Sequence, residues 1–434
     1  MQDPIVHSDD SSASLVISWV LMIPLFYFAS LGVLWFQSAE SNHSGLGPFS
    51  SAFRTSTAGL ESRAIVALVF LVVAVAVFSR MKAVIGLCRT GGVFVALVTL
   101  ALASCAWSQY PATSLQAALY LALDTLFAFY LYRRFSHKQL LELFMMIGWI
   151  CLIMGFTLAL FFPQYGISNY EGEGAWRGIS AQKNTCSLIT TFLLPAAFCS
   201  PAATALSKIS RVIYIVLSAF MILMTQSGTG KTVLACLLLY AIVMRNHNGL
   251  SRGYKRIKLL AGVAAGAALL FVYMSYFSEI TYMLGKDPTL TGRTEIWKSV
   301  IPSVLKRPLL GYGYQAFWGG LQGESLNVWL VNRWAVSSVH NGYLEMWLGL
   351  GVVGLGLVIY SLVGALRNAF ICLTAGESPS YTWYVSIVLL TIILSVDESG
   401  TIACVNELPW IMYTIACVGL SDGAKRIRLG LDHE

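Results

Sequence analysis

The chain has 434 residues, of which 57% are hydrophobic (AVILMFWYC) and only 11% are charged, whereas soluble domains carry about a quarter charged residues. Its 28 Lys and Arg and 21 Asp and Glu, with a net charge of +7, cannot cover a globule of this size, which excludes a cytosolic enzyme, a disordered chain and a fibrous protein. The mean hydropathy is +0.69. We therefore interpret the chain as a polytopic membrane protein.

Apolar runs that approach the length of a membrane span number about a dozen, and they predict an all-α fold, a polytopic transmembrane helical bundle. The first run follows an acidic start (Asp3, Asp9 and Asp10), whereas a cleaved signal peptide begins with basic residues, so we expect a retained span. The predicted spans are residues 15–37, 64–79, 91–107, 113–131, 140–162, 186–200, 209–226, 232–244, 257–276, 341–366, 382–396 and 402–420.

The distribution of Lys and Arg predicts the orientation of the chain. With the N-terminus in the cytoplasm, the inner loops carry most of the 28 positive charges, and both termini lie inside. The long connections 38–63, 163–185 and 277–340 then all lie on the outer face, where we expect the protein to act. The chain thus divides into spans one to nine (1–276), a large outer loop (277–340), and spans ten to twelve with a cytoplasmic tail (341–434).

The large outer loop is predicted to contain an amphipathic helix. From Arg293 to Leu305, apolar residues recur at three- and four-residue spacing, and such a helix tends to lie along the membrane interface. At its start, Gly292 and Arg293 offer backbone N–H groups and a guanidinium, which together suit an anion. The alternative is a surface arrangement of Arg293 with Glu295, which is worth little energetically.

Two more outer stretches carry cations. Arg177 and Lys183 close the second long loop just before a span, and anchoring at the membrane interface explains them equally well. The stretch Ser227 to Thr232 looks like a phosphate loop, but the required first glycine is Thr225 and no soluble β-α-β unit surrounds it. For Lys231 we therefore expect an anionic lipid head group as neighbour rather than ATP.

The stretch Arg307 to Trp318 follows the amphipathic helix. Pro308 and two glycines predict a turn, and the rings of Tyr312 and Tyr314 suit either stacking on a sugar or packing on the membrane surface. Further on, His340 would sit at a helix N-terminus, where the dipole disfavours an imidazolium. A neutral imidazole can accept a proton, although a histidine at a helix start is more often a cap than a base.

Four acids complete the set of candidates. Asp124 lies within an apolar run, and Asp397, Glu398 and Glu407 flank the outer connection between the last two predicted spans. Acids within membrane segments usually face the protein interior and are functional candidates. Structural pairing with a neighbouring arginine is the alternative.

Together these stretches resemble the bacterial O-antigen ligase / polysaccharide polymerase superfamily of membrane glycosyltransferases, most of all its exopolysaccharide polymerase branch. The signature is an Arg-Gly…Lys-Asn stretch before a middle span, Thr-Gly-Arg-Thr-x-x-Trp and Arg-Pro-x-x-Gly-x-Gly in a large outer loop, and His-Asn at the next span. Here the motifs read Arg177-Gly178 with Lys183-Asn184, Thr291 to Trp297 with Arg307 to Gly313, and His340 to Glu345. Gln182 departs from the pattern, since the family often has His before the Lys-Asn pair.

The resemblance implies a GT-C-like enzyme of the bacterial inner membrane that works at the periplasmic face. Its donor would be an oligosaccharide on undecaprenyl diphosphate, and the diphosphate would leave when an acceptor hydroxyl attacks the sugar. Arg177 and Arg293 match the family's diphosphate-binding arginines, and His340 matches the family histidine, so we predict these three as catalytic. The predicted substrate-binding residues are Lys183, Asn184, Arg307, Lys231, Tyr312, Tyr314, Asn341 and Glu345.

We expect no cofactor, since the sequence has no Asp-x-Asp metal motif. The resemblance implies the growing polysaccharide, membrane lipids, and flippase and chain-length or export proteins as further partners. A polymerase and a ligase that transfers glycan to lipid A-core share the donor and the site, and differ in the acceptor. A secondary transporter usually has two six-span halves joined by a long inner loop, whereas the connection 200–210 is short. A scaffold without chemistry has only the aromatic-rich outer loop in its favour.

Overall fold

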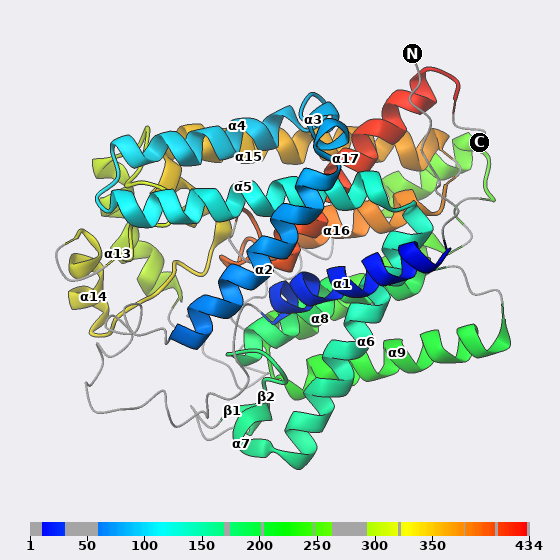
Figure 1. Cartoon of the computed structure of the whole chain (residues 1–434), viewed down its shortest axis with the longest axis horizontal. Coiled ribbons are helices and arrows are strands. Elements are labelled where there is room, and N and C mark those ends of the chain that lie inside the picture. The colour runs from blue at the N-terminus through cyan, green and yellow to red at the C-terminus, as the bar shows by residue number, and fades with distance from the viewer. Residues whose placement is uncertain are drawn as a thin grey trace.

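The computed structural model shows a protein that is almost entirely helical, as the sequence predicts (Figure 1). It describes residues 11–30, 60–168, 174–200, 204–245, 247, 249–262, 293–319, 323–376, 378–403 and 407–431. The elements are α1 (Ser11–Ala29), α2 (Leu60–Ser79), α3 (Met81–Leu87), α4 (Gly92–Ala103), the 3-10 helix η3 (Ser104–Ala106), α5 (Pro111–Arg134), α6 (His137–Phe161), α7 (Pro163–Gly166), β1 (Ile167–Ser168), β2 (Ala175–Trp176), α8 (Lys183–Cys199), α9 (Ala205–Met224), α10 (Gly228–Met244), α13 (Arg293–Lys306), α14 (Ser325–Asn332), α15 (Gly342–Ala375), α16 (Ser380–Leu394) and α17 (Leu408–Arg428).

Several of these helices are membrane-spanning by length and apolar composition, and the chain is a membrane protein. Among the described residues, 4 helices pass on their own, namely α5, α6, α9 and α15, and a fifth results if α2 and α3, bent by 85° at their junction, form one span. Other predicted spans are shorter helices, such as α10 with 17 residues and α16 with 15. The span predicted at 257–276 lies mostly outside the described residues. The count of about twelve spans therefore stays a prediction.

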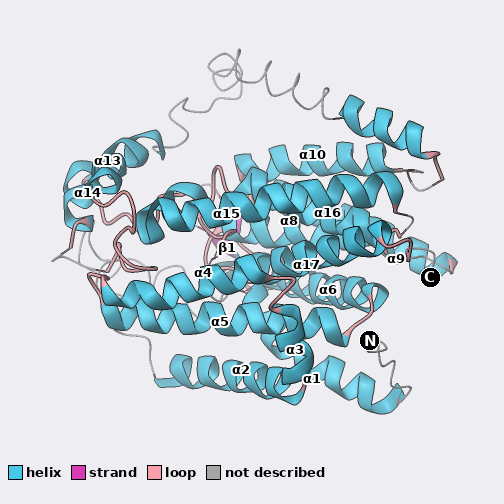
Figure 2. Ribbon diagram, turned by 90° about the horizontal axis from the view of Figure 1, so that it is seen from above, coloured by secondary structure: helices cyan, strands magenta, loops and turns pink. Residues whose placement is uncertain are grey.

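The long helices pack side by side into one bundle (Figures 1 and 2). Seen from above, α1 and α2 lie on one flank and α10 on the other (Figure 2). Helix α17 is buried continuously from Leu408 to Leu420 and packs against α5, α15 and α16. Its Trp410 and Tyr413 are buried together with Trp383 and Tyr384 of α16. Because these rings fill the bundle centre, the chemistry-bearing loops are left at its two ends.

The contacts at each end of the bundle agree with the predicted grouping of the loops into two sets. At one end, Gln109 donates from Nε2 to the carbonyl of Ala316 at 2.9 Å, which joins two predicted outer loops. At the other end, Tyr132 donates to Asp422 at 3.1 Å and Lys255 donates to the carbonyl of Gly376 at 3.0 Å, which joins predicted inner segments. Outer segments thus meet outer ones and inner segments meet inner ones, whereas the compartment on each side stays a prediction.

The described part of the large outer loop has a hydrophobic core of its own. The amphipathic helix predicted from Arg293 to Leu305 forms as α13, and its Ile296, Val300 and Val304 are buried against α14 and the turns around it. Ile301 and Leu305, predicted on the same apolar face, are instead exposed by 44% and 63%. This folded segment lies at the end of the bundle where α15 begins (Figure 1).

Backbone hydrogen bonds at a break in α15 join this outer segment to the membrane helices. Gly351 has φ 69° and ψ −168°, which interrupts the helix, and such a conformation is accessible to glycine alone at low cost. The turn after α13 supplies the missing backbone partners. Tyr312 N–H donates to the Leu348 carbonyl at 2.9 Å, and Val352 N–H donates to the Pro308 carbonyl at 2.8 Å. A Cβ atom at Gly311 would lie 2.5 Å from the Leu348 carbonyl oxygen, so glycine is required there as well.

Candidate active site

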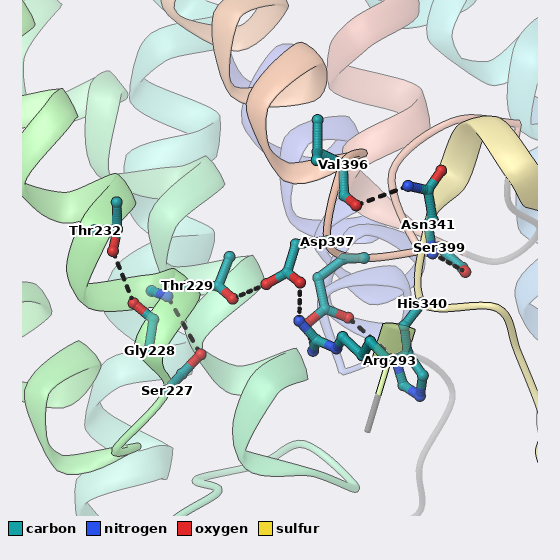
Figure 3. A network of polar contacts seen from close by, with 12 residues as sticks. Ser227, Gly228, Thr229, Thr232, Arg293, His340, Asn341, Val396, Asp397 and Ser399 are labelled. Carbon is teal, nitrogen blue, oxygen red and sulfur yellow. Dashed lines mark hydrogen bonds and ion pairs between the residues drawn. The ribbon is translucent and has the colours of Figure 1, made fainter. Parts of the chain in front are cut away.

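A cluster of charged residues forms where the outer segment meets the end of α16. Arg293, the first residue of α13, lies between Asp397 and Glu398 (Figure 3). Its Nη1 pairs with Asp397, and its Nη2 lies 3.1 Å from Glu398 Oε1. The two acids are held by the turn that ends α16, since the backbone N–H of each donates to the Leu394 carbonyl. The side chains of Arg293 and Glu398 are only 13% and 14% exposed, so water screens these charges weakly.

His340 joins the same cluster from the start of α15. Its ring lies beside Arg293 (Figure 3), and its Nδ1 is 3.9 Å from Glu398 Oε2. This Nδ1 is buried and has no hydrogen-bond partner among the described residues. His340 also has φ 52°, in the left-handed region, which is uncommon for a residue with a side chain and recurs at functional sites.

Asn341 and Glu345 hold the backbone around His340. The Asn341 side chain caps α15 by accepting from the N–H groups of Tyr343 and Leu344 at 3.1 and 2.9 Å. It also donates to the Val396 carbonyl at 2.8 Å, beside Asp397 (Figure 3). The Glu345 carboxylate accepts from the backbone N–H of Val339 at 2.8 Å, just before His340. Both residues, predicted to bind substrate, therefore lie next to the cluster and fix its geometry.

The start of α10 touches the cluster through Thr229, whose hydroxyl donates to the second oxygen of Asp397 (Figure 3). The helix begins at Gly228 with Ser227 as its cap, which accepts from the Gly230 N–H at 3.2 Å. Helix α9, and not a strand, directly precedes it, so the phosphate-loop pattern marks the capped start of a helix. Lys231 is exposed in the first turn.

Lys183 and Asn184 are the first two residues of α8 and are half-buried. This helix packs against α10 and α16, which both lead into the cluster. At the contact, a Cβ atom at Gly230 would lie 1.8 Å from Ser187 Oγ, so the two helix starts are in close contact. Positive helix N-termini therefore gather on this side of Arg293, and they favour an anion there.

Arg177 supports its own loop. The side chain is 5% exposed, and burial lowers the pKa of its guanidinium from the usual value. Its Nε donates to the Tyr165 carbonyl at 2.8 Å and its Nη1 to the Ala181 carbonyl at 3.4 Å. The loop it holds leads directly into Lys183, the first residue of α8. Its predicted role with a diphosphate stays a prediction.

Arg307 and the two tyrosines of the glycine turn also have internal contacts. The exposed Arg307 guanidinium lies 4.9 Å from the centre of the Tyr312 ring, a cation–π geometry. Tyr312 and Tyr314 are buried, and their hydroxyls donate to the carbonyls of Ser303 and Ala403. The first contact lies within the outer segment, and the Tyr314 contact joins this segment to the connection between α16 and α17.

Two of the four candidate acids, Asp397 and Glu398, thus lie in the cluster. Asp124 is fully buried in α5, and Glu407 is the residue before α17, with a buried Oε2 that has no hydrogen-bond partner among the described residues. The sequence alone does not identify the partner of the outer acids, and Thr229 is not among the predicted site residues. The pair of adjacent acids at the outer end of a span was the available signal for Asp397 and Glu398, whereas a threonine in a helix start gives none.

Arg293 supplies a group in this cluster that is chemically suited to an anion. The guanidinium faces two carboxylates, and its forked donors fit the oxygens of a diphosphate equally well. An imidazole with one buried nitrogen near a carboxylate can hold a proton there and accept a second one at its other nitrogen. The residues present therefore combine an anion-binding group with a candidate base.

Comparison with known proteins identifies sequences that are similar to parts of this chain. Residues 213–359 match the family model described as "O-Antigen ligase", a region that begins in α9 and includes Arg293, Arg307 and His340. A stretch of 154 residues is 31% identical to "Exopolysaccharide production protein ExoQ" of Rhizobium meliloti (strain 1021), covering 34% of this chain and 35% of that relative. The chain is thus aligned with about a third of the length of this curated relative. The resemblance drawn from the motifs is confirmed, and residues 213–359 carry the O-antigen ligase family region.

Proposed function

We propose that the protein is a membrane glycosyltransferase that joins repeat units carried on undecaprenyl diphosphate into an exopolysaccharide. The observation that carries this proposal is the meeting of Arg293 and His340 at one carboxylate, Glu398, inside the region that matches the O-antigen ligase family. An anion-binding guanidinium next to a candidate base is what displacement of a diphosphate by a hydroxyl requires.

The reaction makes one bond and breaks one. The acceptor hydroxyl oxygen attacks the anomeric carbon of the donor sugar, and the bond from that carbon to the diphosphate oxygen breaks with its electron pair. The hydroxyl proton passes to His340 Nε2, and undecaprenyl diphosphate leaves with the added negative charge. Arg293 stabilises this charge as it develops, because its donors are already fixed in a weakly screened site. In this proposal the protein's own cations, and no metal cofactor, neutralise the leaving group.

Further positive groups favour the same location for the diphosphate. The starts of α8 and α10 point their N-termini to this end of the bundle, and Lys183 is the first residue of α8. Arg177, matched to the family's second arginine, holds the loop that leads to Lys183. We propose that Lys183 meets the diphosphate from the side opposite to Arg293, with Arg177 as a predicted third cation. The Glu345 and Asn341 side chains keep the His340 backbone in place for the acceptor.

The name of the relative favours a polymerase, and the family description keeps an O-antigen ligase as the second candidate. Deletion of the gene followed by glycan analysis separates them. A polymerase predicts loss of long exopolysaccharide with single repeat units retained on the lipid. A ligase predicts lipid A-core without glycan and full-length polymer still on the lipid carrier. Unchanged glycans of both kinds would contradict either enzyme.

The site is proposed to face the periplasm. In a variant without the nine native cysteines, a cysteine at the exposed Leu309, in the turn after α13, should react with an impermeant thiol reagent added to intact cells. A cysteine at the exposed Arg256, in a predicted inner loop, is the matched control and should react only after lysis. The reverse pattern would invert the topology and contradict the proposed location.

A further inference from the structure

Glu398 contacts both groups to which the reaction is ascribed, and it uses a different oxygen for each. Its Oε1 lies 3.1 Å from Arg293 Nη2, and its Oε2 lies 3.9 Å from His340 Nδ1. The first separation is that of a charged hydrogen bond, whereas the second is about 1 Å too long for one. Glu398 is thus bound to the arginine and close to, but not bound to, the histidine.

The remaining contacts of Arg293 and His340 indicate which side chain of the cluster can change its partner. Arg293 has a second carboxylate, Asp397, which Thr229 holds in place. His340 Nδ1 is buried without a hydrogen-bond partner among the described residues, an unfavourable state for a polar nitrogen. A small rotation of the Glu398 side chain toward Nδ1 would relieve it. Arg293 would then need a new acceptor in place of Glu398, and a phosphate oxygen is a suitable one.

We propose that Glu398 is a positioning residue. When the donor binds, its carboxylate exchanges the contact with Arg293 for a hydrogen bond with His340. In one arrangement Glu398 pairs with the Arg293 guanidinium, as in this structure. When the donor diphosphate takes over Arg293, Glu398 accepts a hydrogen bond from His340 Nδ1–H and leaves Nε2 free to accept the acceptor proton. This inference rests on the proposed function and adds to it an order of events, in which the base is oriented only after the donor is bound.

Such an exchange has a chemical benefit. A base that is oriented in the empty enzyme could activate water as soon as a donor enters, which would waste lipid-linked glycan by hydrolysis. Coupling the orientation of His340 to the binding of diphosphate on Arg293 ties catalysis to the correct substrate, as in other enzymes whose sites assemble on binding. The carboxylate also stabilises the imidazolium that forms when His340 takes the proton.

The test uses the purified full-length chain and a donor with one repeat unit on undecaprenyl diphosphate. Glu398→Gln keeps the size of the side chain and removes its charge. Glu295→Gln removes a charge from an exposed position two residues after Arg293 and is the matched control. We expect Glu398→Gln to lower kcat by about tenfold or more, within the range that general base catalysis contributes. Its KM for the donor should stay equal or fall, because a competitor for Arg293 has been weakened.

This split separates positioning from a structural role. Loss of structure would raise KM and lower kcat together, and that outcome would overturn the proposal. Glu398→Asp keeps the charge with a shorter reach, so its kcat should lie between those of Glu398→Gln and the unchanged protein. If Glu398→Gln does not fold, Glu398→Asp alone decides. A kcat equal to that of the unchanged protein then overturns the proposal, and a severalfold loss at unchanged KM supports it.

The proposed function and this inference can fail separately. If the unchanged protein transfers no glycan, or if His340→Asn remains fully active, the proposed function fails. If the unchanged protein is active, His340→Asn is inactive and Glu398→Gln behaves like Glu295→Gln, only the exchange of Glu398 is wrong. Asparagine is chosen at position 340 because it tolerates the left-handed backbone found there.

Discussion

Each end of the bundle contains a histidine near an acid, but the two clusters are built differently. At the predicted inner end, His137 opens α6 and its Nδ1 lies 2.5 Å from the Tyr384 hydroxyl. The Tyr132 hydroxyl beside it is bound to Asp422 at 3.1 Å. At the outer end, His340 Nδ1 faces Glu398 across 3.9 Å without a hydrogen bond.

The two clusters differ in how completely their polar and charged groups are paired. The inner cluster uses neutral hydroxyls that are hydrogen-bonded to their neighbours, and the Tyr132 and Tyr384 rings pack against His137. Such a network holds α5, α6, α16 and α17 together. The outer cluster has two carboxylates for one guanidinium and a histidine in a left-handed conformation. We interpret the outer cluster, in which two carboxylates share one guanidinium, as the one that rearranges when a ligand binds.

The largest expected effect is the loss of glycan transfer when the outer cluster is changed. Arg293→Gln and His340→Asn should each lower polymer formation by at least about a hundredfold, because one loses the cation for the leaving group and the other the base. The measurement is polymer length and yield, compared at equal amounts of folded protein, in cells that carry only the variant.

Matched controls come from the inner end and from α13. His137→Asn and Lys298→Gln, the latter an exposed cation on the same helix as Arg293, should both retain polymer formation. Full-length polymer from either outer variant would remove that residue from the site. Loss of polymer in His137→Asn at normal protein levels would mean that both ends take part and would break the comparison.

A second prediction concerns the stability of the outer cluster. Arg293→Gln leaves Asp397 and Glu398 adjacent without their cation, and because these side chains are partly exposed, the loss should lower the free energy of unfolding by about 1 kcal/mol. Adding Asp397→Asn should recover part of this loss, because the remaining repulsion is removed. Thermal unfolding of the single and double variants in detergent measures the coupling. Additive effects would show that the two side chains do not interact in the folded protein.

At the inner end, an effect of similar size is expected. Tyr384→Phe removes the hydroxyl that meets His137 and should lower the free energy of unfolding by about 1 kcal/mol, the value of one buried hydrogen bond. Transfer activity should be unchanged at matched amounts of folded protein. A strong fall in activity without a fall in stability would give the inner histidine a functional role that its contacts do not suggest.

The smallest expected effect depends on pH and concerns Glu324, the residue before α14. Burial raises the pKa of its carboxyl, but hydrogen bonds from Lys306, Asn327 and Ser303 outweigh burial and lower the pKa below the ordinary 4.5. The folded state is therefore stabilised above that value, and the stabilisation is lost as the pH falls through the lowered pKa. The gain is below about 1 kcal/mol, because the Lys306 side chain is largely exposed.

Thermal unfolding at about pH 6 and about pH 4 measures this dependence. Glu324→Gln should lose part of the stability difference between the two conditions, whereas Glu295→Gln, which removes an exposed carboxylate, should keep it. An equal pH dependence in both variants would show that the contacts of Glu324 do not stabilise the fold.

The helices could be predicted well from sequence, because a membrane span is a local property. The runs predicted at 186–200 and 209–226 appear as α8, Lys183–Cys199, and α9, Ala205–Met224, with ends shifted by only a few residues. The amphipathic helix of the outer loop was predicted almost to its last residue. Spacing of apolar residues within one turn or two carries this information.

The partners within the site could not be predicted in the same way. Arg293 and Glu398 are 105 residues apart, and Thr229 and Asp397 are 168 apart, so no local pattern links them. The motif around His340 identified the residue but not its left-handed backbone, which depends on contacts of Asn341 and Glu345 with the turn after α16. The glycines between Arg307 and Gly313 correctly predict a turn. The break in α15 at Gly351, to which this turn is hydrogen-bonded, lies too far along the chain to be predicted from the same pattern.

The break in α15 at Gly351 limits which sequences can be exchanged between this protein and its relatives. Because backbone groups on both sides of Gly351 are completed by the turn at 308–313, the outer segment is not a transplantable module. The bonds themselves use backbone groups that almost any residue supplies, but a Cβ atom at Gly311 or Gly351 would lie 2.5 or 2.0 Å from the carbonyl oxygen of the opposite segment. Chimeras with relatives should therefore fold only if glycine is kept at both positions.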